Sequence, residues 1–242
     1  MSRSSFNPVL RSLRKLSILS LVALSLVGVG FYLKLSQSAA NTSSAVVSKV
    51  FPDPATDIST GQAKGMQTAV FAGGCYWGVE AVFEHLKGVS DVVSGFSGGS
   101  AETAHYGLVS FGQTGHAEAV KVTYDPAQIS YGQLLKIYFA VAHDPTQLNR
   151  QGPDSGTQYR SAIFFANNAQ KQVAQAYIDQ LNAAHTFNQP IVTQLTPLND
   201  FYPAEAEHQN FIANNPNYPY VVIHDLPKLK QLKGQFATLY KN

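Results

Sequence analysis

Runs with the two-residue period of a β-strand alternate with runs that have the 3.6-residue period of a helix along residues 67–240. The gaps between them include both hairpin and crossover lengths. This pattern predicts an α+β fold, with a mainly antiparallel but mixed sheet, helices packed on it in a ferredoxin-like two-layer core, and long functional loops. The expected strands are 68–72, 91–96, 116–125, 161–166 and 191–195; the expected helices are 76–87, 131–143, 168–184 and 204–214; the expected loops are 97–115 and 144–160.

Composition limits how this fold is stabilised and what it binds. The chain is 45% hydrophobic and 11% aromatic, which is enough for a core, and it has one cysteine, which excludes an internal disulfide. Its formal net charge is only +2, with 13% charged residues, so a polybasic nucleic-acid surface is not expected. We expect residues 67–242 to form one catalytic domain, acting as a monomer.

The N-terminal residues differ from the rest of the chain. Arginines and a lysine precede the uncharged apolar run 16–33, and small residues follow it. This pattern is typical of a signal peptide or a signal anchor, and the sequence leaves both open for residues 1–40. Export to the periplasm or another extracytoplasmic space is expected, as a soluble protein or one tethered through 16–33. Residues 41–66, rich in small and polar residues, are expected to be a flexible linker.

The single cysteine, Cys75, lies where an expected strand ends and an expected helix begins. Gly73 and Gly74 precede it and allow a tight turn and close approach of other segments. A helix N-terminus stabilises negative charge, so the position predicts a lowered thiol pKa and a nucleophilic thiolate. The alternative is a buried structural cysteine, which is common for a lone thiol.

Glu118 is the second candidate for chemistry. In the expected strand 116–125 it shares a face with Val120, Val122 and Tyr124, because side chains alternate along a strand. A carboxyl on an apolar face has a raised pKa, so it can remain protonated near neutral pH and donate a proton. The alternative is a glutamate at the strand end that reaches solvent.

Other polar residues are more ambiguous. Asp154, Tyr159 and Arg160 lie in a loop that leads into a strand, where functional residues often occur, but the loop also has ordinary turn chemistry. Glu205 and His208 form one Glu-x-x-His pattern, whereas a di-iron site needs two, so no metal site is expected.

Several motifs resemble those of the A-type peptide methionine sulfoxide reductases. They occur in the family's order and at matching spacings, from about Thr68 to at least Pro227. They are GGCYWGVEAVF, TGHAEAVKVTYDP, AHDPTQ, GPDSGTQYRSAIF and FYPAEAEHQNF.

The resemblance implies a role for each matched residue. Cys75 matches the cysteine whose thiolate attacks the sulfoxide sulfur, and Glu118 matches the acid that protonates the sulfoxide oxygen. Two tyrosines, Tyr106 and Tyr159, match residues that hold this oxygen, with Asp154 in support. Tyr76 and Trp77 match the aromatic pair that receives the substrate's methyl group. The implied substrate is the S epimer of methionine sulfoxide, free or in proteins, and the implied product on the enzyme is a sulfenic acid.

Two departures from the family stand out. Tyr76 replaces the usual Phe, and the C-terminal region has no cysteine to resolve the sulfenic acid. An external thiol is therefore expected to reduce Cys75: thioredoxin, a glutaredoxin-like protein or a small thiol, with no bound cofactor. Two alternatives remain at this point: a thiol peroxidase that uses the same cysteine, and a tethered binder of oxidised methionine with little turnover.

Overall fold

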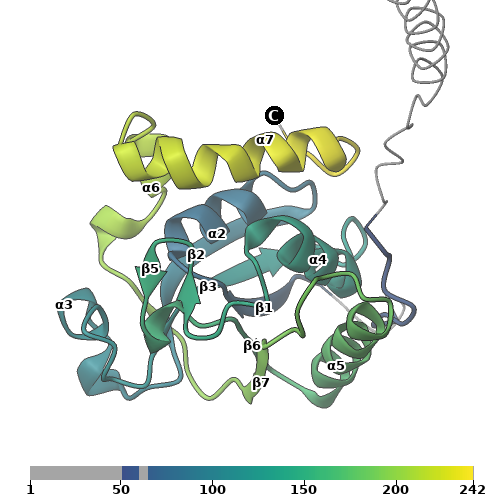
Figure 1. Ribbon diagram of the computed structural model, residues 1–242, viewed down its shortest axis with the longest axis horizontal. Coiled ribbons are helices and arrows are strands. Elements are labelled where there is room, and N and C mark those ends of the chain that lie inside the picture. Colours follow the sequence, from purple (N-terminus) through teal and green to yellow (C-terminus); the bar gives the residue numbers. More distant parts are fainter. Residues whose placement is uncertain (1–50, 60–64, 242) are drawn as a thin grey trace, which may run out of the picture. The chain divides into compact units, whose positions relative to one another are not determined.

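The computed structural model describes residues 51–59 and 65–241, and its centre is a six-stranded mixed sheet (Figure 1). The strands are β1 (Gln67–Ala72), β2 (Val89–Ser97), β3 (Ala117–Tyr124), β6 (Ala162–Phe165), β7 (Gln194–Pro197) and β8 (Tyr202–Pro203). Their order is β7–β6–β1–β3–β2–β8. All neighbouring pairs are antiparallel except β6 and β7.

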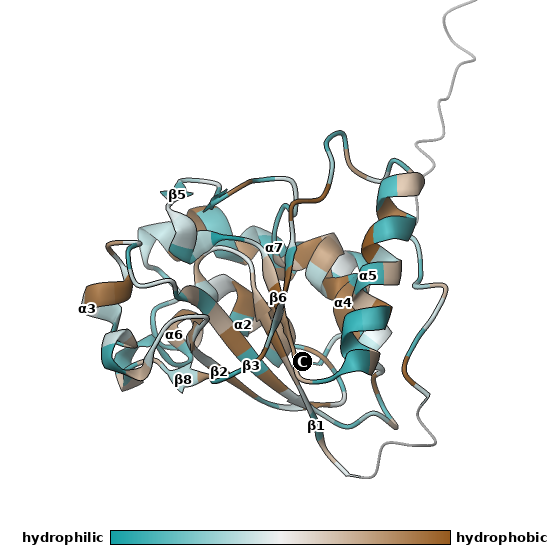
Figure 2. Cartoon of the chain, turned by 90° about the horizontal axis from the view of Figure 1, so that it is seen from below, coloured by the Kyte–Doolittle hydropathy of each residue, from teal (hydrophilic) through white to brown (hydrophobic). Residues whose placement is uncertain are grey.

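Four of these strands form a split βαβ arrangement with two helices. The chain runs from β1 through helix α2 (Tyr76–Glu84) to β2, then from β3 through α4 (Tyr131–Ile137) to β6. Since β3 lies between β1 and β2, this is the ferredoxin-like topology, and the predicted α+β fold is confirmed. Helix α5 (Asn168–Ala183) then leads to the parallel strand β7, and it lies beside α4 (Figure 2).

The sheet buries two unequal apolar layers. On one face, alternate residues of β1 and β3, such as Phe71 and Val120, pack with the inner sides of the helices in the main core. On the other face, Val70 and Ala119 belong to a smaller cluster that is closed by Leu198 and Phe201. Each strand therefore supplies both layers through its two-residue alternation.

Local sequence signals set several helix ends. Ser130 accepts a hydrogen bond from the Gln133 amide at 3.1 Å, and the Gln133 side chain accepts one from the Ser130 amide, which completes a capping box. Asn167 caps α5 in the same way, by accepting from the Gln170 amide at 3.0 Å. The predicted cap at Ser130 is thus confirmed. Helix α4 does not extend to residue 143 as expected, because the chain continues from its end as a π-helical turn, η4 (Tyr138–Ala142).

The expected helix 204–214 is wrong. The segment forms a short 3₁₀ turn, η6 (Ala206–His208), and a four-residue helix, α6 (Phe211–Asn214). Between them Asn210 adopts a left-handed conformation with φ of 53°, which interrupts any continuous helix.

The expected loops contain short elements. Residues 97–115 include η3 (Ala101–Thr103) and α3 (Tyr106–Val109). Residues 144–160 include a small hairpin of β4 (Arg150–Gln151) and β5 (Asp154–Ser155), followed by the 3₁₀ turn η5 (Thr157–Tyr159). The C-terminal region forms a π-helical turn, η7 (Val221–Asp225), and the helix α7 (Leu226–Gln235), which packs on α2.

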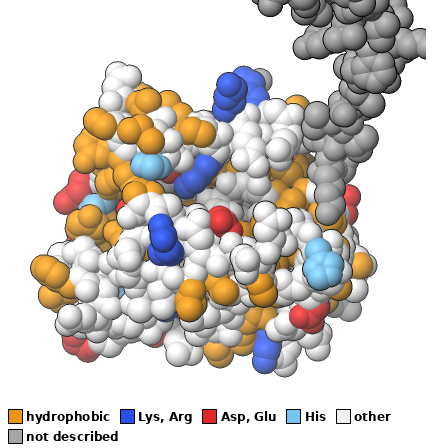
Figure 3. Space-filling model, viewed as in Figure 1, with side chains coloured by type: hydrophobic (Ala, Val, Ile, Leu, Met, Phe, Trp, Pro, Cys, Tyr) orange, Lys and Arg blue, Asp and Glu red, His pale blue; other side chains and the backbone are white. Residues whose placement is uncertain are grey.

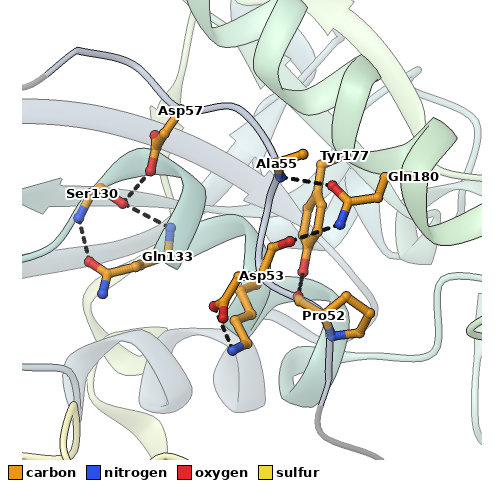
Figure 4. A network of polar contacts seen from close by, with 9 residues as sticks. Pro52, Asp53, Ala55, Asp57, Ser130, Gln133, Tyr177 and Gln180 are labelled. Atoms are coloured by element: carbon orange, nitrogen blue, oxygen red, sulfur yellow. Dashed lines mark hydrogen bonds and ion pairs between the residues drawn. The ribbon is translucent and has the colours of Figure 1, made fainter.

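Residues 51–59, part of the expected linker 41–66, are bonded to the domain (Figure 4). Asp57 accepts hydrogen bonds from the Ser130 hydroxyl and, at 2.8 Å, from the Gly132 amide. The Tyr177 hydroxyl donates to the Pro52 carbonyl at 2.6 Å, and Gln180 bonds both the Asp53 carbonyl and the Ala55 amide. These contacts join this segment to the start of α4 and to α5.

The N-terminal predictions fall outside the described residues. The expected signal segment 1–40, with its apolar run 16–33, belongs to the part of the chain that the structure leaves undescribed. Within residues 51–59 and 65–241, no helix has the length and apolar character needed to cross a bilayer.

Candidate active site

Cys75 occupies the N-cap position of α2, as its place in the sequence predicts. The preceding turn needs both glycines. Gly74 has φ of +88°, and a Cβ on Gly73 would lie 2.8 Å from the ring of His143. Below the turn, the Tyr138 hydroxyl donates to the Ala72 carbonyl at 2.7 Å. The turn that precedes Cys75 is therefore packed closely against His143, and the end of β1 is bonded to η4.

The expected lowering of the Cys75 pKa is wrong for the substrate-free protein. The side chain is partly exposed, but the sulfur is so enclosed that lost hydration raises the pKa of the thiol well above its ordinary value. The carboxyl groups of Glu118, Asp225 and Asp154 act in the same direction. Only the backbone N–H of Trp77, at the start of α2, lowers the pKa. The helix N-terminus thus acts as expected, but burial outweighs it, and the resting cysteine is a thiol.

Glu118 points into the protein from the first residues of β3. It is 2% exposed, and its Oε2 accepts a hydrogen bond from the Tyr76 amide at 3.1 Å. Desolvation raises the pKa of Glu118 to about 8, with the Tyr76 bond opposing this and Asp154 adding to it. The alternative of a solvent-facing glutamate is excluded, because the carboxyl is buried beside Cys75 and is mainly protonated at neutral pH.

The seven residues singled out in the sequence line one pocket of about 200 Å³. Two further tyrosines, Tyr218 and Tyr220, complete its wall and were missed, because the only sequence signal is an aromatic-rich stretch, NPNYPY, which follows the last motif and belongs to none of them. The seven expected residues are Cys75, Tyr76, Trp77, Tyr106, Glu118, Asp154 and Tyr159.

Trp77 forms the most strongly fixed part of the pocket wall. Its indole is stacked on Phe211, with ring centroids 3.6 Å apart and planes 5° from parallel. Tyr218 and Tyr220 meet it edge-on, and its Nε1 donates a hydrogen bond to Nδ1 of His208 at 3.3 Å. Such contacts fix the orientation of the indole and leave an apolar surface toward the pocket.

The two residues of the Glu-x-x-His pattern, Glu205 and His208, hold side chains of the pocket wall in place. Glu205 Oε1 accepts a hydrogen bond from the Tyr106 amide at 3.0 Å, and the His208 ring lies 4.3 Å from that of Tyr106. Burial lowers the pKa of His208, consistent with a neutral ring that accepts from Trp77. Across the described residues, no group of three or more His, Cys, Asp or Glu side chains is arranged to hold a metal ion.

The opposite side of the pocket joins the 144–160 segment to the C-terminal region. The Tyr220 hydroxyl donates to Oδ2 of Asp154, and Tyr159 lies nearby in η5. Burial, followed by the charge of Glu118, raises the pKa of Tyr159, so its hydroxyl keeps its proton. Arg160 does not line the pocket; its guanidinium bonds the carbonyls of Gly115 and His116.

Tyr76 carries a hydroxyl that is buried without a hydrogen-bond partner. Leaving such a donor unpaired costs about 1–3 kcal/mol. We therefore expect Tyr76→Phe to raise the free energy of unfolding by about 1 kcal/mol, measured by urea denaturation. The matched control is Tyr138→Phe, which removes a hydroxyl that is bonded to Ala72 and should lower the stability instead. An equal effect of the two substitutions would contradict the unpaired state of Tyr76.

Exposed apolar side chains lie next to this pocket on the C-terminal segment. Figure 3 shows hydrophobic side chains gathered over α6 and the neighbouring start of α7. Those with substantial exposure there are Tyr218, Val222, Ile223 and Leu226.

Comparisons with known proteins agree with this arrangement. The model of the family described as peptide methionine sulfoxide reductase matches residues 67–239. The peptide methionine sulfoxide reductase MsrA 2 of Synechocystis sp. is 56% identical over 196 residues, which cover 80% of this chain and 92% of that protein. MsrA 2 of Mesorhizobium japonicum is 59% identical over 178 residues, with coverages of 74% and 91%.

Solved structures agree as well. Methionine sulfoxide reductase A of Corynebacterium diphtheriae superposes with a TM-score of 0.56 at 37% identity, covering 69% of this chain and 84% of that one. Mxr1 of Saccharomyces cerevisiae in its reduced form gives a TM-score of 0.58 at 31% identity, covering 63% and 87%. The family match spans the strands, the helices and every residue of the pocket, and the chain therefore belongs to the A-type peptide methionine sulfoxide reductase family.

Proposed function

We propose that this chain reduces the S epimer of methionine sulfoxide, free or in proteins, and so repairs oxidised proteins. The observation that carries the proposal is the placement of a cysteine thiol, a mainly protonated buried carboxyl and an apolar aromatic wall around one small pocket. Membership of the family supports the same activity.

The chemistry uses the two groups at the base of the pocket. Glu118 donates its proton to the sulfoxide oxygen, which is a poor leaving group until it is protonated. The Cys75 sulfur attacks the substrate sulfur and forms an S–S bond with it. The protonated oxygen then moves to the Cys75 sulfur, as its bond to the substrate sulfur and the new S–S bond both break, and Cys75 becomes a sulfenic acid. The thiol proton restores Glu118, and methionine leaves. The cysteine sulfur is oxidised by two electrons and the substrate sulfur is reduced by two.

The remaining pocket residues hold the substrate. The hydroxyls of Tyr106 and Tyr159, which keep their protons, donate hydrogen bonds to the sulfoxide oxygen. Asp154 supports this side of the pocket through its bond with Tyr220. Tyr76 and Trp77 receive the methyl group, for which an aromatic surface is well suited. Proton loss from Cys75 accompanies substrate binding, because burial keeps the resting group neutral.

Regeneration of the thiol depends on a second molecule. Cys75 is the only cysteine in 242 residues, so its sulfenic acid has no internal partner with which to form a disulfide. A thioredoxin-like protein or a small thiol supplies the two electrons. We also propose that the protein is exported, since a basic start precedes the apolar run 16–33. The mass of the mature N-terminus distinguishes a cleaved signal from a retained anchor.

A stereochemical assay tests the proposal. Residues 51–242 are incubated with dithiothreitol and either the S or the R epimer of methionine sulfoxide, and methionine is measured. We expect methionine from the S epimer and at least tenfold less from the R epimer, since the methyl and oxygen sites are fixed. A thiol peroxidase would consume hydrogen peroxide and yield no methionine, and a binder without turnover would retain oxidised peptide unchanged. Either result would overturn the proposal.

A further inference from the structure

Glu80 is a second buried carboxyl on α2, and the proposed reaction does not use it. It is 1% exposed, and its Oε2 accepts a hydrogen bond from the Asn210 amide at 3.1 Å. Its Oε1 has no hydrogen bond of normal geometry, although Ser94 of β2 is close enough to lower the pKa of the carboxyl, and no Lys or Arg in the described part of the chain forms an ion pair with it. Burying such a group costs free energy that an apolar residue would avoid, so its contact with Asn210 calls for an explanation.

Asn210, which donates to Glu80, lies in the middle of the segment 208–211 that orients Trp77. His208 accepts the indole hydrogen bond and Phe211 is stacked on the indole, with Asn210 between them in the chain. Asn210 has φ of 53°, in the left-handed region, which asparagine adopts more readily than most non-glycine residues but which is still less favourable than a helical conformation. The bond from Glu80 to the Asn210 amide is one of the contacts that hold it there.

Glu80 and Trp77 meet this segment from the same side of α2. They are three residues apart, which places them as neighbours on one helix surface. Ala81 follows Glu80 directly and lies one turn after Trp77, and it packs in one apolar cluster with Ile212 of α6. Gln209 anchors the segment on its other side by bonding both the amide and the carbonyl of Ser94 in β2, each at 2.9 Å. The segment is therefore fixed to β2 by Gln209 and to α2 by Glu80.

We propose that Glu80 is a positioning residue for the substrate pocket: by holding the Asn210 amide, it keeps His208 and Phe211 against Trp77 and so fixes the wall that receives the substrate's methyl group. This inference rests on the role proposed above for Trp77. Burial raises the pKa of Glu80 to about 7, opposed by its bond to Asn210, so the carboxyl is partly protonated near neutral pH. When the carboxyl is protonated, Oε1 carries the proton, and no negative charge is buried without a partner.

The test uses Trp77 as its own reporter, because it is the only tryptophan in the chain. In Glu80→Ala we expect a shift of the fluorescence emission maximum and stronger quenching by acrylamide. We expect KM for free S-methionine sulfoxide to rise about fivefold to tenfold, as for the loss of one hydrogen bond, while kcat changes by less than about threefold. Glu80→Gln keeps an acceptor for the Asn210 amide and should restore both the emission and KM.

Two controls separate positioning from general stability. Asp179→Asn changes an exposed carboxyl on α5, where it accepts a hydrogen bond from Gln175 of the same helix, and should leave emission and KM unchanged. If Glu80→Ala does not fold, Glu80→Asp, which withdraws the carboxyl by one methylene, should show a smaller shift in the same directions. Normal emission and KM in a folded Glu80→Ala or Glu80→Asp would overturn the inference. Failure of the proposed function appears separately, as an absence of methionine with the unaltered protein.

Discussion

Cys75→Ser should reduce methionine formation from S-methionine sulfoxide by about 10⁴-fold or more, to the background rate. The sulfur is both the nucleophile and the acceptor of the sulfoxide oxygen. A serine hydroxyl is a far weaker nucleophile, and it would have to accept that oxygen as a hydroperoxide, which contains a weak O–O bond. No second thiol in the chain can substitute for Cys75. The measurement is steady-state turnover with dithiothreitol as the reductant.

The same variant should fold normally, because serine is close to cysteine in size and Cys75 is only partly buried. Its thermal midpoint should lie within a few degrees of the unaltered protein. Without any thiol, the unaltered protein should release one methionine per chain and stop, with a sulfenic acid at Cys75 that is detectable by a sulfenic-acid-specific reagent. Multiple turnovers under those conditions, or substantial activity in Cys75→Ser, would contradict the central role of this residue.

Glu118→Gln should lower kcat by roughly 10²- to 10⁴-fold, the usual contribution of a general acid. The amide retains the shape and an acceptor for the Tyr76 amide but has no acidic proton. In the unaltered protein, kcat should fall as the pH rises through about 8, because Glu118 then loses the proton that it must donate. This decline should be absent from the residual activity of the variant. A pH profile with the same decline in both proteins would assign it to another group.

Although Glu118→Gln lowers kcat, it should raise the free energy of unfolding. The pKa of Glu118 in the folded state, about 8, lies above its ordinary value of 4.5. The folded state therefore binds more protons between those values, and the stability due to protonated Glu118 is lost progressively as the pH rises toward 8. Glu118→Gln removes this loss, so at pH 7 to 8 the variant should be more stable by on the order of 2 kcal/mol. Glu102→Gln, at an exposed position, is the matched control.

Local patterns were enough to predict the parts of the site that depend on a few neighbouring residues. The two glycines before Cys75 and the helical period after it placed the sulfur at the start of α2. The two-residue period of β3 placed Glu118 on the buried face, where its carboxyl does lie. The cap at Ser130 followed from the same kind of short-range signal. In each case the required physics acts over fewer than about ten residues.

The features that sequence reasoning missed depend on contacts between distant segments. The helix predicted over 204–214 failed because Asn210 is bonded to Glu80, 130 residues away, in a conformation that a helix does not permit. Tyr218 and Tyr220 join the pocket only because the C-terminal region packs on α2. The pKa of Cys75 was predicted from its helix, yet its direction is decided by burial against groups from several elements.

One consequence of the pocket concerns the order of events during turnover. The sulfur that takes oxygen from the substrate and the sulfur that the reductant must reach are the same atom, in a space of about 200 Å³ lined by five tyrosines. Substrate and reductant therefore exclude one another and must visit in alternation, which gives ping-pong kinetics. A high level of oxidised methionine would then slow the cycle by occupying the pocket of chains that await reduction. Under severe oxidation, the turnover of such an enzyme is therefore expected to rise with the supply of thiol.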